Sequence, residues 1–500
     1  CVSACSWRLH EPSAGINPNW NDSPWALRCE TAKSYPSLPG EFPPVDDIDW
    51  LWAADKSDNQ LTLTGELEDG FFLLESALDS TGEPITANKE TLRALCLDSM
   101  SAAYPQQPRV LGKVRAARRG EDVDVAIVYP LQSGHSYELK RVVVFGDSLS
   151  DAGRLKDRLY IFPGKPYWMG RFSNGPIWTS YLEASSELSM QNHSYGGASV
   201  VRTGTLPGEG LIARLREGGQ FFVSGSIELQ IEDYIDRNLT TGKLQDPSGT
   251  LFVVWAGAND YISKEPISGA IYTFLNSPEG ESGYQVVADK TIAGLVKQIH
   301  RLYQIGARRF LLPDLPDLGL TPIVLQNKTY ISGQGFTSDE GRRHELSRRL
   351  SELTDYHNRV LRAAISQLRQ DLSDSTVLLL NSSQFTQRIR SGRSLAQESV
   401  SFDYGFTLDA QRETLSHKGH ILQLERRCYT GGYIGAINTG TTCDSPRSAL
   451  FWDVVHPTSF THCWQAYQLG LMLAEQGWIK RPPEPNAYRD WCTGYPNRDT

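Results

Sequence analysis

Hydrophobic positions follow different spacings on the two sides of residue 140. Before it, a helix is expected near 88–103, and short apolar runs typical of β-strands lie at 61–65, 71–76 and 123–129. Residues 1 to about 40 are rich in Pro, Ser, Asn and Trp without a period, which predicts an irregular segment pinned by Cys5 and Cys29. The pattern therefore predicts a small β-rich accessory domain over 1–135, with a linker close to its end.

Beyond residue 140, solid apolar runs alternate with amphipathic stretches. Apolar runs with the length of buried strands lie at Val142–Phe145, Leu251–Trp255, Phe310–Leu312 and Val377–Leu380, and a further short strand is expected around Gln191–Tyr195. The i, i+3, i+4, i+7 spacing of a helical face appears at 292–303 and again at 338–372. This alternation predicts right-handed βαβ crossovers and a mostly parallel five-stranded sheet, covered by helices on both faces, over 141–480. The Pro-rich end, 481–500, is expected to form a tail.

Composition narrows the class of protein. The 500 residues are 40% hydrophobic and 10% aromatic, which is enough for a large core. Residues 1–140 hold 12 Lys and Arg against 21 Asp and Glu, and the remainder is electrically balanced. This charge distribution excludes nucleic acid as an expected partner. No apolar run reaches transmembrane length and no signal peptide is recognisable, so we expect a mature, soluble chain.

The cysteines indicate an exported protein. Their even number and scattered positions suit disulfides. They form no C-x-x-C pair, which argues against a structural zinc site. They are Cys1, Cys5, Cys29, Cys96, Cys428, Cys443, Cys463 and Cys492. A lipid-modified Cys1 is the alternative for the first of them. His417 and His420 have no accompanying carboxylate or thiol cluster, which favours a surface loop over a metal site. We therefore expect a secreted chain without a metal or organic cofactor.

Polar residues follow the predicted strands at their carboxyl ends. The first run ends in Gly146-Asp147-Ser148, which predicts a sharp turn that exposes the hydroxyl of Ser148. On its own this triplet is more typical of an ordinary strand-to-helix turn with Asp or Ser as the cap. In parallel sheets, however, ligands bind at the carboxyl ends of strands. Further polar groups stand at Gly196-Gly197-Ala198-Ser199, Gly257-Ala258-Asn259-Asp260 and Asp453-Val454-Val455-His456.

These residue types are the ones that a serine hydrolase needs. A serine hydroxyl is a weak nucleophile at neutral pH, and an imidazole within hydrogen-bond distance can remove its proton. We assign Ser148 as the nucleophile and His456 as the base. Asp453, three residues before the histidine, would accept the other ring N–H and stabilise the imidazolium.

The negative oxygen that forms during the attack needs preorganised donors. We expect these to be the backbone N–H groups of Ser148 and Gly197 and the side chain of Asn259. Gly196 replaces Gly197 if the second motif is shifted by one residue.

Together these motifs resemble the GDSL esterase/lipase family of the SGNH hydrolase superfamily, from about 141 to 479. The order Gly-Asp-Ser-Leu-Ser, Gly-Gly, Gly-x-Asn-Asp and Asp-x-x-His carries the resemblance. Residues 170–178 and 451–458 are similar to the bacterial branch that contains phospholipases, thermolabile haemolysins and glycerophospholipid:cholesterol acyltransferases. The resemblance implies a flavodoxin-like three-layer α/β sandwich and a Ser-His-Asp mechanism without a cofactor.

The stretch between Cys428 and Cys443 holds four glycines and no Lys or Arg. Its length suits closure by a disulfide, and its position matches a disulfide-bounded loop in the acyltransferase branch. A lid beside the active site is one hypothesis for this loop, and a plain surface loop is the other.

The expected function is that of a secreted esterase that cleaves acyl esters of phospholipids or lysophospholipids through an acyl-serine. It would contact a membrane surface transiently, and the acyl group could also pass to a sterol. One alternative is a carbohydrate O-acetyl esterase whose N-terminal domain binds glycan through Trp50 and Trp52, although the pattern favours core packing of these rings. Another is a non-catalytic adhesin or binding module on a hydrolase scaffold.

Overall fold

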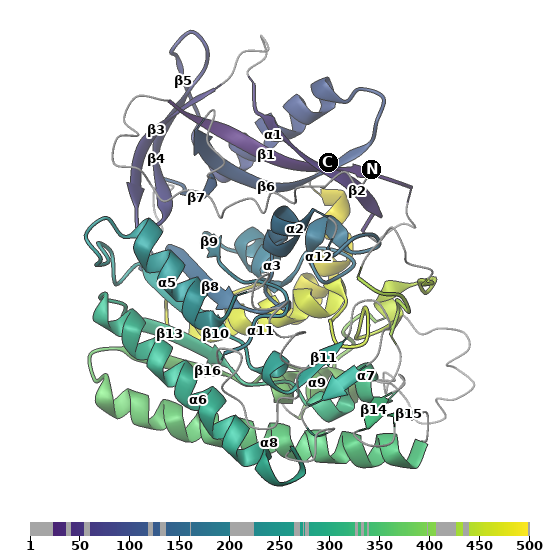
Figure 1. Ribbon diagram of the computed structural model, residues 1–500. Coiled ribbons are helices and arrows are strands. Elements are labelled where there is room, and N and C mark those ends of the chain that lie inside the picture. The colour runs from purple at the N-terminus through teal and green to yellow at the C-terminus, as the bar shows by residue number, and fades with distance from the viewer. Residues whose placement is uncertain are drawn as a thin grey trace, which may run out of the picture.

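The computed structural model shows a β-domain packed on an α/β-domain (Figure 1). The residues that it describes are 24–36, 42–54, 61–118, 124–130, 137–160, 162–200, 225–264, 271–273, 275, 280–325, 329–331, 335–337, 340–397, 399–406, 427–433 and 440–498.

The N-terminal domain is a closed sheet. Its strands follow the order β2-β1-β3-β4-β7-β6, and β1 also pairs with β6, so the sheet closes into a barrel, with β5 added to β4. Most pairs are antiparallel, whereas β4 and β7 are parallel. The elements are β1 (Trp25–Ser34), β2 (Val45–Trp52), β3 (Thr62–Glu68), β4 (Phe71–Leu78), β5 (Pro84–Ile85), α1 (Lys89–Ala103), β6 (Arg109–Arg118) and β7 (Asp124–Val128).

The expectation of an irregular N-terminal segment is wrong for its second half. Residues Trp25–Ser34 form strand β1 instead of irregular chain. Because β1 pairs on both sides and is buried on both faces, it has none of the alternation that marks a half-buried strand. Cys29, which was expected to pin this segment, forms its disulfide with Cys96 of α1, and Cys5 lies outside the described residues.

The α/β-domain contains the predicted five-stranded parallel sheet. Its order is β16-β13-β10-β8-β9, which places β8 beside the centre of the sheet. The strands are β8 (Arg141–Gly146), β9 (Ser189–Asn192), β10 (Thr250–Trp255), β13 (Arg309–Pro313) and β16 (Thr376–Leu380). Four of these coincide closely with the predicted runs, and β9 begins two residues earlier than the strand expected around Gln191–Tyr195. The complete burial of β8, β10 and β13 explains their solid apolar pattern.

Helices cover both faces of this sheet, which gives the expected three layers (Figure 1). One face packs on α5 (Ile227–Asn238), α6 (Gly280–Gln304) and α8 (Glu340–Asp371). The other face packs on α3 (Trp178–Ser185), α9 (Ser382–Ser391) and α11 (Ser459–Glu475). Alternate residues of β8 serve the two cores, since Val142 and Val144 face one set and Val143 and Phe145 the other.

Shorter elements complete the domain. A small sheet of order β11-β12-β14-β15 lies beside the main one. These and the remaining helices are α2 (Arg154–Leu159), η2 (Trp168–Gly170), η3 (Ala258–Asp260), β11 (Ile262–Lys264), β12 (Ile271–Thr273), η5 (Leu318–Leu320), α7 (Pro322–Leu325), β14 (Thr329–Ile331), β15 (Gly335–Thr337), η7 (Pro446–Ser448) and α12 (Pro485–Arg498).

The Pro-rich end of the chain is not a simple tail. Helix α12 spans Pro485–Arg498, and Cys492 within it forms a disulfide with Cys463 of α11. The ring of Tyr488 packs against that of Tyr467, with centroids 4.5 Å apart. The terminal helix is therefore part of the core beneath α11.

The two domains share a buried boundary. Phe71 and Ala126 of the barrel belong to the same core as Val143 and Phe145 of β8. At the edge strand β9, the side chain of Gln191 accepts a hydrogen bond of 3.3 Å from the backbone N–H of Ala126. The barrel thereby covers an edge that would otherwise present unpaired backbone groups.

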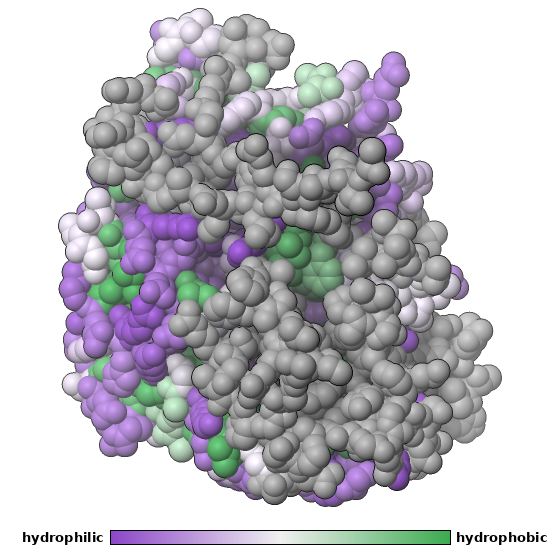
Figure 2. Space-filling view, in the orientation of Figure 1, coloured by the Kyte–Doolittle hydropathy of each residue, from purple (hydrophilic) through white to green (hydrophobic). Residues whose placement is uncertain are grey.

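The visible surface is mixed in character. Figure 2 shows hydrophilic side chains along the left of this face, where α5 and α6 lie in Figure 1, and a hydrophobic area near its centre. Among the helices in the described part of the chain, none combines the length and the apolar character needed to cross a membrane.

Candidate active site

The carboxyl end of β8 leads directly into the turn that carries Ser148. Gly146 still pairs with Trp255 of β10, and its backbone N–H and C=O bind the side-chain amide of Gln230 at 3.0 and 2.9 Å. A Cβ atom at Gly146 would lie 2.8 Å from the carbonyl oxygen of Trp255, so this close approach of two strands requires glycine. The half-buried Ser148 follows two residues later, on a turn fixed by the sheet itself.

The structure brings Ser148, His456 and Asp453 together from distant parts of the chain. His456 Nε2 lies 2.7 Å from Ser148 Oγ, and His456 Nδ1 lies 2.7 Å from Asp453 Oδ2. The other carboxylate oxygen of Asp453 accepts hydrogen bonds from the backbone N–H groups of Val455 and His456, at 2.9 and 2.8 Å. Asp453 is completely buried and His456 nearly so. This arrangement can carry a proton from the hydroxyl to the imidazole.

Residues 167–176, which we call the support segment, run alongside residues 453–459, which we call the acid–base loop. Hydrogen bonds join the two segments at successive positions. The hydroxyl of Tyr167 donates to Asp453 Oδ2 at 2.6 Å, and the hydroxyl of Ser173 donates to the carbonyl oxygen of Pro457 at 2.9 Å. The backbone N–H of Ser459 donates to the side-chain oxygen of Asn174 at 2.8 Å. These contacts hold the loop at the point where its side chains meet Ser148.

Aromatic rings surround His456. The ring of Phe172, in the support segment, lies 4.9 Å from the imidazole, and that of Tyr433 lies 5.8 Å from it, measured between centroids. A Cβ atom at Gly196 would collide with Phe172, so glycine is needed for this ring to reach its place. The motifs of the sequence did not single out Tyr167 or Phe172 individually. Phe172 lies within the stretch 170–178 that carries the family resemblance, whereas Tyr167 lies just before it.

The second glycine pair is divided between two tasks. The backbone N–H of Gly196 donates to Asp151 Oδ2 at 2.8 Å, so it is already engaged. Gly197 adopts a positive φ of 82°, a conformation that favours glycine. Asn259 lies beside this turn, with its Nδ2 3.0 Å from the carbonyl oxygen of Ala198. Of the two glycines, Gly197 is therefore the better candidate for an oxyanion donor.

Two further carboxyl groups are buried in the nucleophile turn, residues 146–151. Burial raises the pKa of both Asp147 and Asp151 to about 6. Asp147 accepts a hydrogen bond from the backbone N–H of Leu149 at 3.0 Å, and Asp151 accepts one from that of Arg154 at 2.7 Å. These bonds brace the turn and the start of α2.

Other histidines lie away from the reacting atoms. His462 is buried in α11, and burial lowers its pKa to about 3. Burial likewise lowers the pKa of His357, which binds the hydroxyl of Tyr261 at 2.8 Å, to about 3. His417 and His420 lie outside the described residues. Within the described ranges, no group of three or more His, Cys, Asp or Glu side chains is placed to hold a metal ion.

A disulfide joins Cys428 to Cys443 beside the acid–base loop. The backbone N–H of Tyr429 donates to the carbonyl oxygen of Trp452 at 2.6 Å, directly before Asp453. The base of the disulfide loop is therefore anchored next to the triad. Residues 434–439, on which the lid hypothesis depends, lie outside the described residues.

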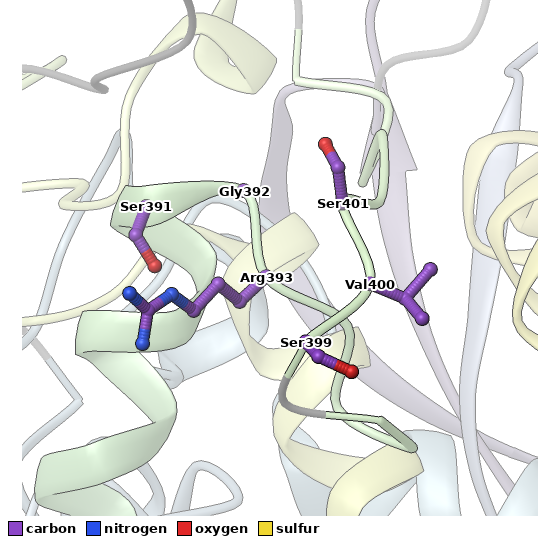
Figure 3. A pocket seen from close by; sticks show the side chains of 6 residues that line it. All are labelled: Ser391, Gly392, Arg393, Ser399, Val400 and Ser401. Carbon is purple, nitrogen blue, oxygen red and sulfur yellow. The ribbon is translucent and has the colours of Figure 1, made fainter.

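A separate surface pocket of about 460 Å³ lies at the end of α9 (Figure 3). It is lined by 391–393 and 399–401. In this view the side chain of Arg393 extends toward Ser391, away from 399–401, and that of Val400 points in the opposite direction. None of these residues belongs to the triad.

Comparison with known proteins gives a consistent picture. A family model described as GDSL-like Lipase/Acylhydrolase matches residues 142–469. A phosphatidylcholine-sterol acyltransferase from Aeromonas hydrophila is 24% identical over 346 residues, which cover 64% of this chain and 86% of the relative. A thermolabile hemolysin from Vibrio parahaemolyticus is 28% identical over 190 residues, or 37% of this chain and 36% of the relative.

Among solved structures, a family two carbohydrate esterase from Clostridium thermocellum aligns over 91% of this chain and 92% of its own. The identity is 11% and the TM-score is 0.29, so this likeness carries no argument about substrate.

Proposed function

Since the chain belongs to the GDSL-like lipase/acylhydrolase family and is thereby an ester hydrolase, we propose that it is a secreted serine esterase that acts on acyl esters of phospholipids or lysophospholipids. The observation that carries the proposal is the hydrogen-bonded series Ser148–His456–Asp453, with 2.7 Å between each pair of reacting atoms. Distances of this size suit proton transfer.

In the first half of the reaction, Ser148 Oγ attacks the ester carbonyl carbon while His456 Nε2 takes the hydroxyl proton. Asp453 stabilises the imidazolium that results. The tetrahedral intermediate then collapses, the bond to the alcohol oxygen breaks, and His456 returns its proton to the departing alcohol. The acyl group remains on Ser148.

In the second half, a water molecule loses its proton to His456 and attacks the acyl-serine. The fatty acid leaves and the proton returns to Ser148 Oγ. The backbone N–H groups of Ser148 and Gly197, with the side chain of Asn259, are the proposed donors to the negative oxygen in both halves. Every proton and acyl group is accounted for by the substrate, water and these side chains.

The names of the relatives support a lipid ester as the substrate. The Aeromonas hydrophila relative is a phosphatidylcholine-sterol acyltransferase, and the Vibrio parahaemolyticus relative is a hemolysin. A sterol hydroxyl in place of water would complete an acyl transfer by the same second half. Three disulfides support an oxidising, extracellular location. Because a phospholipid substrate lies in a bilayer, the enzyme would have to contact the membrane surface transiently to reach it.

The two alternatives receive less support. The guanidinium of Arg28 lies 4.5 Å from the centroid of the Trp50 ring and 6.0 Å from that of Trp52, so the chain's own cation lies against the proposed sugar-stacking surface. A non-catalytic binding module would have no need for the assembled Ser148, His456 and Asp453.

The test is hydrolysis by the wild type and by Ser148→Ala. Long-chain lysophosphatidylcholine, a short-chain nitrophenyl ester and acetylated xylan are the substrates. We expect release of fatty acid from the lysolipid, and a loss of roughly 10⁴-fold or more in kcat with Ser148→Ala. Mass spectrometry after treatment with a fluorophosphonate should find the label on Ser148.

Unchanged hydrolysis by Ser148→Ala would overturn the mechanism. Hydrolysis of the acetylated xylan alone would overturn the lipid substrate and leave the mechanism in place.

A further inference from the structure

Tyr167, in the support segment, has a side chain that donates a hydrogen bond to the triad. Its hydroxyl donates to Asp453 Oδ2 at 2.6 Å, the same oxygen that lies 2.7 Å from His456 Nδ1. Tyr167 is 3% exposed and Asp453 is fully buried, so water does not replace this bond readily.

We propose that Tyr167 is a positioning residue. Its hydroxyl fixes the orientation of the Asp453 carboxylate and reduces the negative charge on Asp453 Oδ2 that stabilises the imidazolium of His456. The proposal rests on the function given above, in which Asp453 is the partner of the base.

The position of Tyr167 is itself closely determined. Its backbone N–H donates to the carbonyl oxygen of Gly164 at 3.1 Å, and the N–H of Gly164 donates to the carbonyl oxygen of Tyr433 at 2.7 Å. Edge-to-face contacts with Tyr429 and Phe172, at 5.5 and 6.0 Å between centroids, fix the ring. The hydroxyl therefore meets the carboxylate in a preset direction.

The hydroxyl remains a donor under all conditions in which the triad works. Burial, followed by the charge of Asp453, raises the pKa of Tyr167 well above its ordinary value. A phenol that stays protonated can only share the charge of the carboxylate and cannot repel it.

Two donors on one carboxylate oxygen compete for its charge. Without the hydroxyl of Tyr167, Oδ2 would keep the imidazole but lose a donor that shares its charge, and the imidazolium form of His456 would be favoured more strongly. His456 would then retain its proton to higher pH and act as a base over a narrower range. The carboxylate would also lose one of the contacts that fix its rotation.

The remaining titratable or charged groups near the pair come from other elements and stay in place when Tyr167 is replaced. They are Asp147 and His462, which lie close enough to His456 for their pKa values to respond to its charge, and Arg427, Tyr429 and Tyr433, which are affected in the same way by the charge of Asp453. Burial raises the pKa of both tyrosines, so their hydroxyls stay neutral.

Tyr167→Phe is the direct test, because it removes one oxygen and retains the ring. We expect kcat on a nitrophenyl ester to fall by about ten- to a hundredfold, the usual effect of losing a hydrogen bond to a charged group. We also expect the acid limb of the kcat/KM profile to move to higher pH. A role in packing alone would change kcat or stability without moving this limb.

Tyr429→Phe is the matched control. Its hydroxyl belongs to the same aromatic cluster but donates to the carbonyl oxygen of Gly432 at 3.0 Å. We expect this variant to keep the wild-type profile. Circular dichroism and thermal unfolding of both variants would verify that they are folded.

A second measurement separates this proposal from the proposed function. Nuclear magnetic resonance of the His456 ring needs no substrate, and in Tyr167→Phe the ring should lose its proton at higher pH than in the wild type. An unchanged midpoint, or an equal shift in Tyr429→Phe, would overturn the role of Tyr167. Failure of the wild type to hydrolyse any ester would overturn the proposed function instead, whatever the ring titration shows.

Discussion

The nucleophile turn and the acid–base loop meet at Ser148 but are held in different ways. The turn, residues 146–151, continues from β8, and its first residue still pairs with β10. The acid–base loop, residues 453–459, lies outside the main sheet and is fixed by side chains of the support segment, 167–176. The position of the nucleophile turn is thus set by strand pairing in the sheet, whereas the position of the acid–base loop depends on contacts between irregular segments.

The two regions also treat their carboxylates differently. Asp147 is buried in the turn and has its pKa raised to about 6, because its hydrogen bonds only partly offset the loss of water. Asp453 accepts hydrogen bonds from Tyr167, from His456 and from two backbone N–H groups. The comparison predicts that only the second carboxylate serves the reaction, and that the first braces the backbone.

Replacing Asp453 and Asp147 one at a time tests this difference between the two carboxylates most directly. Asp453→Asn should lower kcat by about 10⁴-fold, because the amide favours the wrong tautomer of His456. Asp147→Asn keeps an oxygen for the N–H of Leu149 and should cost no more than about tenfold, the equivalent of one neutral hydrogen bond. Steady-state kinetics on a nitrophenyl ester would measure both.

An equal loss in the two variants would show that the turn carboxylate takes part in the chemistry. Thermal unfolding of each variant controls for a general loss of structure.

Asn259→Ala gives the next largest effect. This side chain is the proposed oxyanion donor that does not come from the backbone, and removal of such a donor should lower kcat by about 10²- to 10³-fold with little change in KM. Asn259 Nδ2 also contacts the carbonyl oxygen of Ala198 at 3.0 Å, which orients it. Asn259→Asp is a second variant that keeps the size of the side chain and removes both N–H donors, so it should lower kcat at least as much as Asn259→Ala.

If Asn259→Ala raised KM and left kcat unchanged, the side chain would bind the substrate and not the transition state.

The sequence predicts the nucleophile turn better than it predicts the contacts that hold the acid–base loop. The turn at Ser148 and the parallel strands were accessible because buried strands leave solid apolar runs and their ends collect the polar groups. The sequence also selected Asp453 and His456 as a spaced pair. It gave no direct indication of Tyr167, whose contact with Asp453 joins residues 286 positions apart.

The errors have related physical causes. Strand β1, Trp25–Ser34, is buried on both faces and mixes polar with apolar residues, so it shows neither alternation nor a solid run. Helix α12 was hidden by its prolines, although Cys492 within it was visible. The preference for Gly197 over Gly196 is not among the errors and stays a prediction, which the hydrogen bond from Gly196 to Asp151 supports.

The support segment has an anchor of its own in the barrel. Arg171 Nη2 lies 3.0 Å from Glu30 Oε2 of β1, and Lys113 Nζ lies 3.5 Å from Glu30 Oε1. Both Glu30 and Arg171 are nearly inaccessible to solvent. Burial alone would raise the pKa of Glu30, but Arg171 and Lys113 more than offset it and lower this pKa to about 2. The acid–base loop is therefore linked to the N-terminal domain through the support segment.

Glu30→Gln should show whether this link matters. The lowered pKa corresponds to a loss of about 3 kcal/mol in the free energy of unfolding at neutral pH. Because the wild-type carboxylate contributes this stability above pH 4.5 and loses it as pH falls toward 2, the difference between wild type and variant should shrink over that interval. Urea unfolding at several pH values would measure it.

Glu68→Gln is the matched control for the link. It removes another carboxylate at the domain boundary, but its partner Arg141 keeps Asp69 at 3.4 Å, so a smaller loss of stability is expected. Hydrogen exchange then distinguishes the two halves of the site. In Glu30→Gln the amides of 453–459 should exchange faster while those of 146–151 stay protected, because only the first group depends on the support segment. Equal exchange in both regions would mean that the barrel stabilises the whole domain and not the acid–base loop.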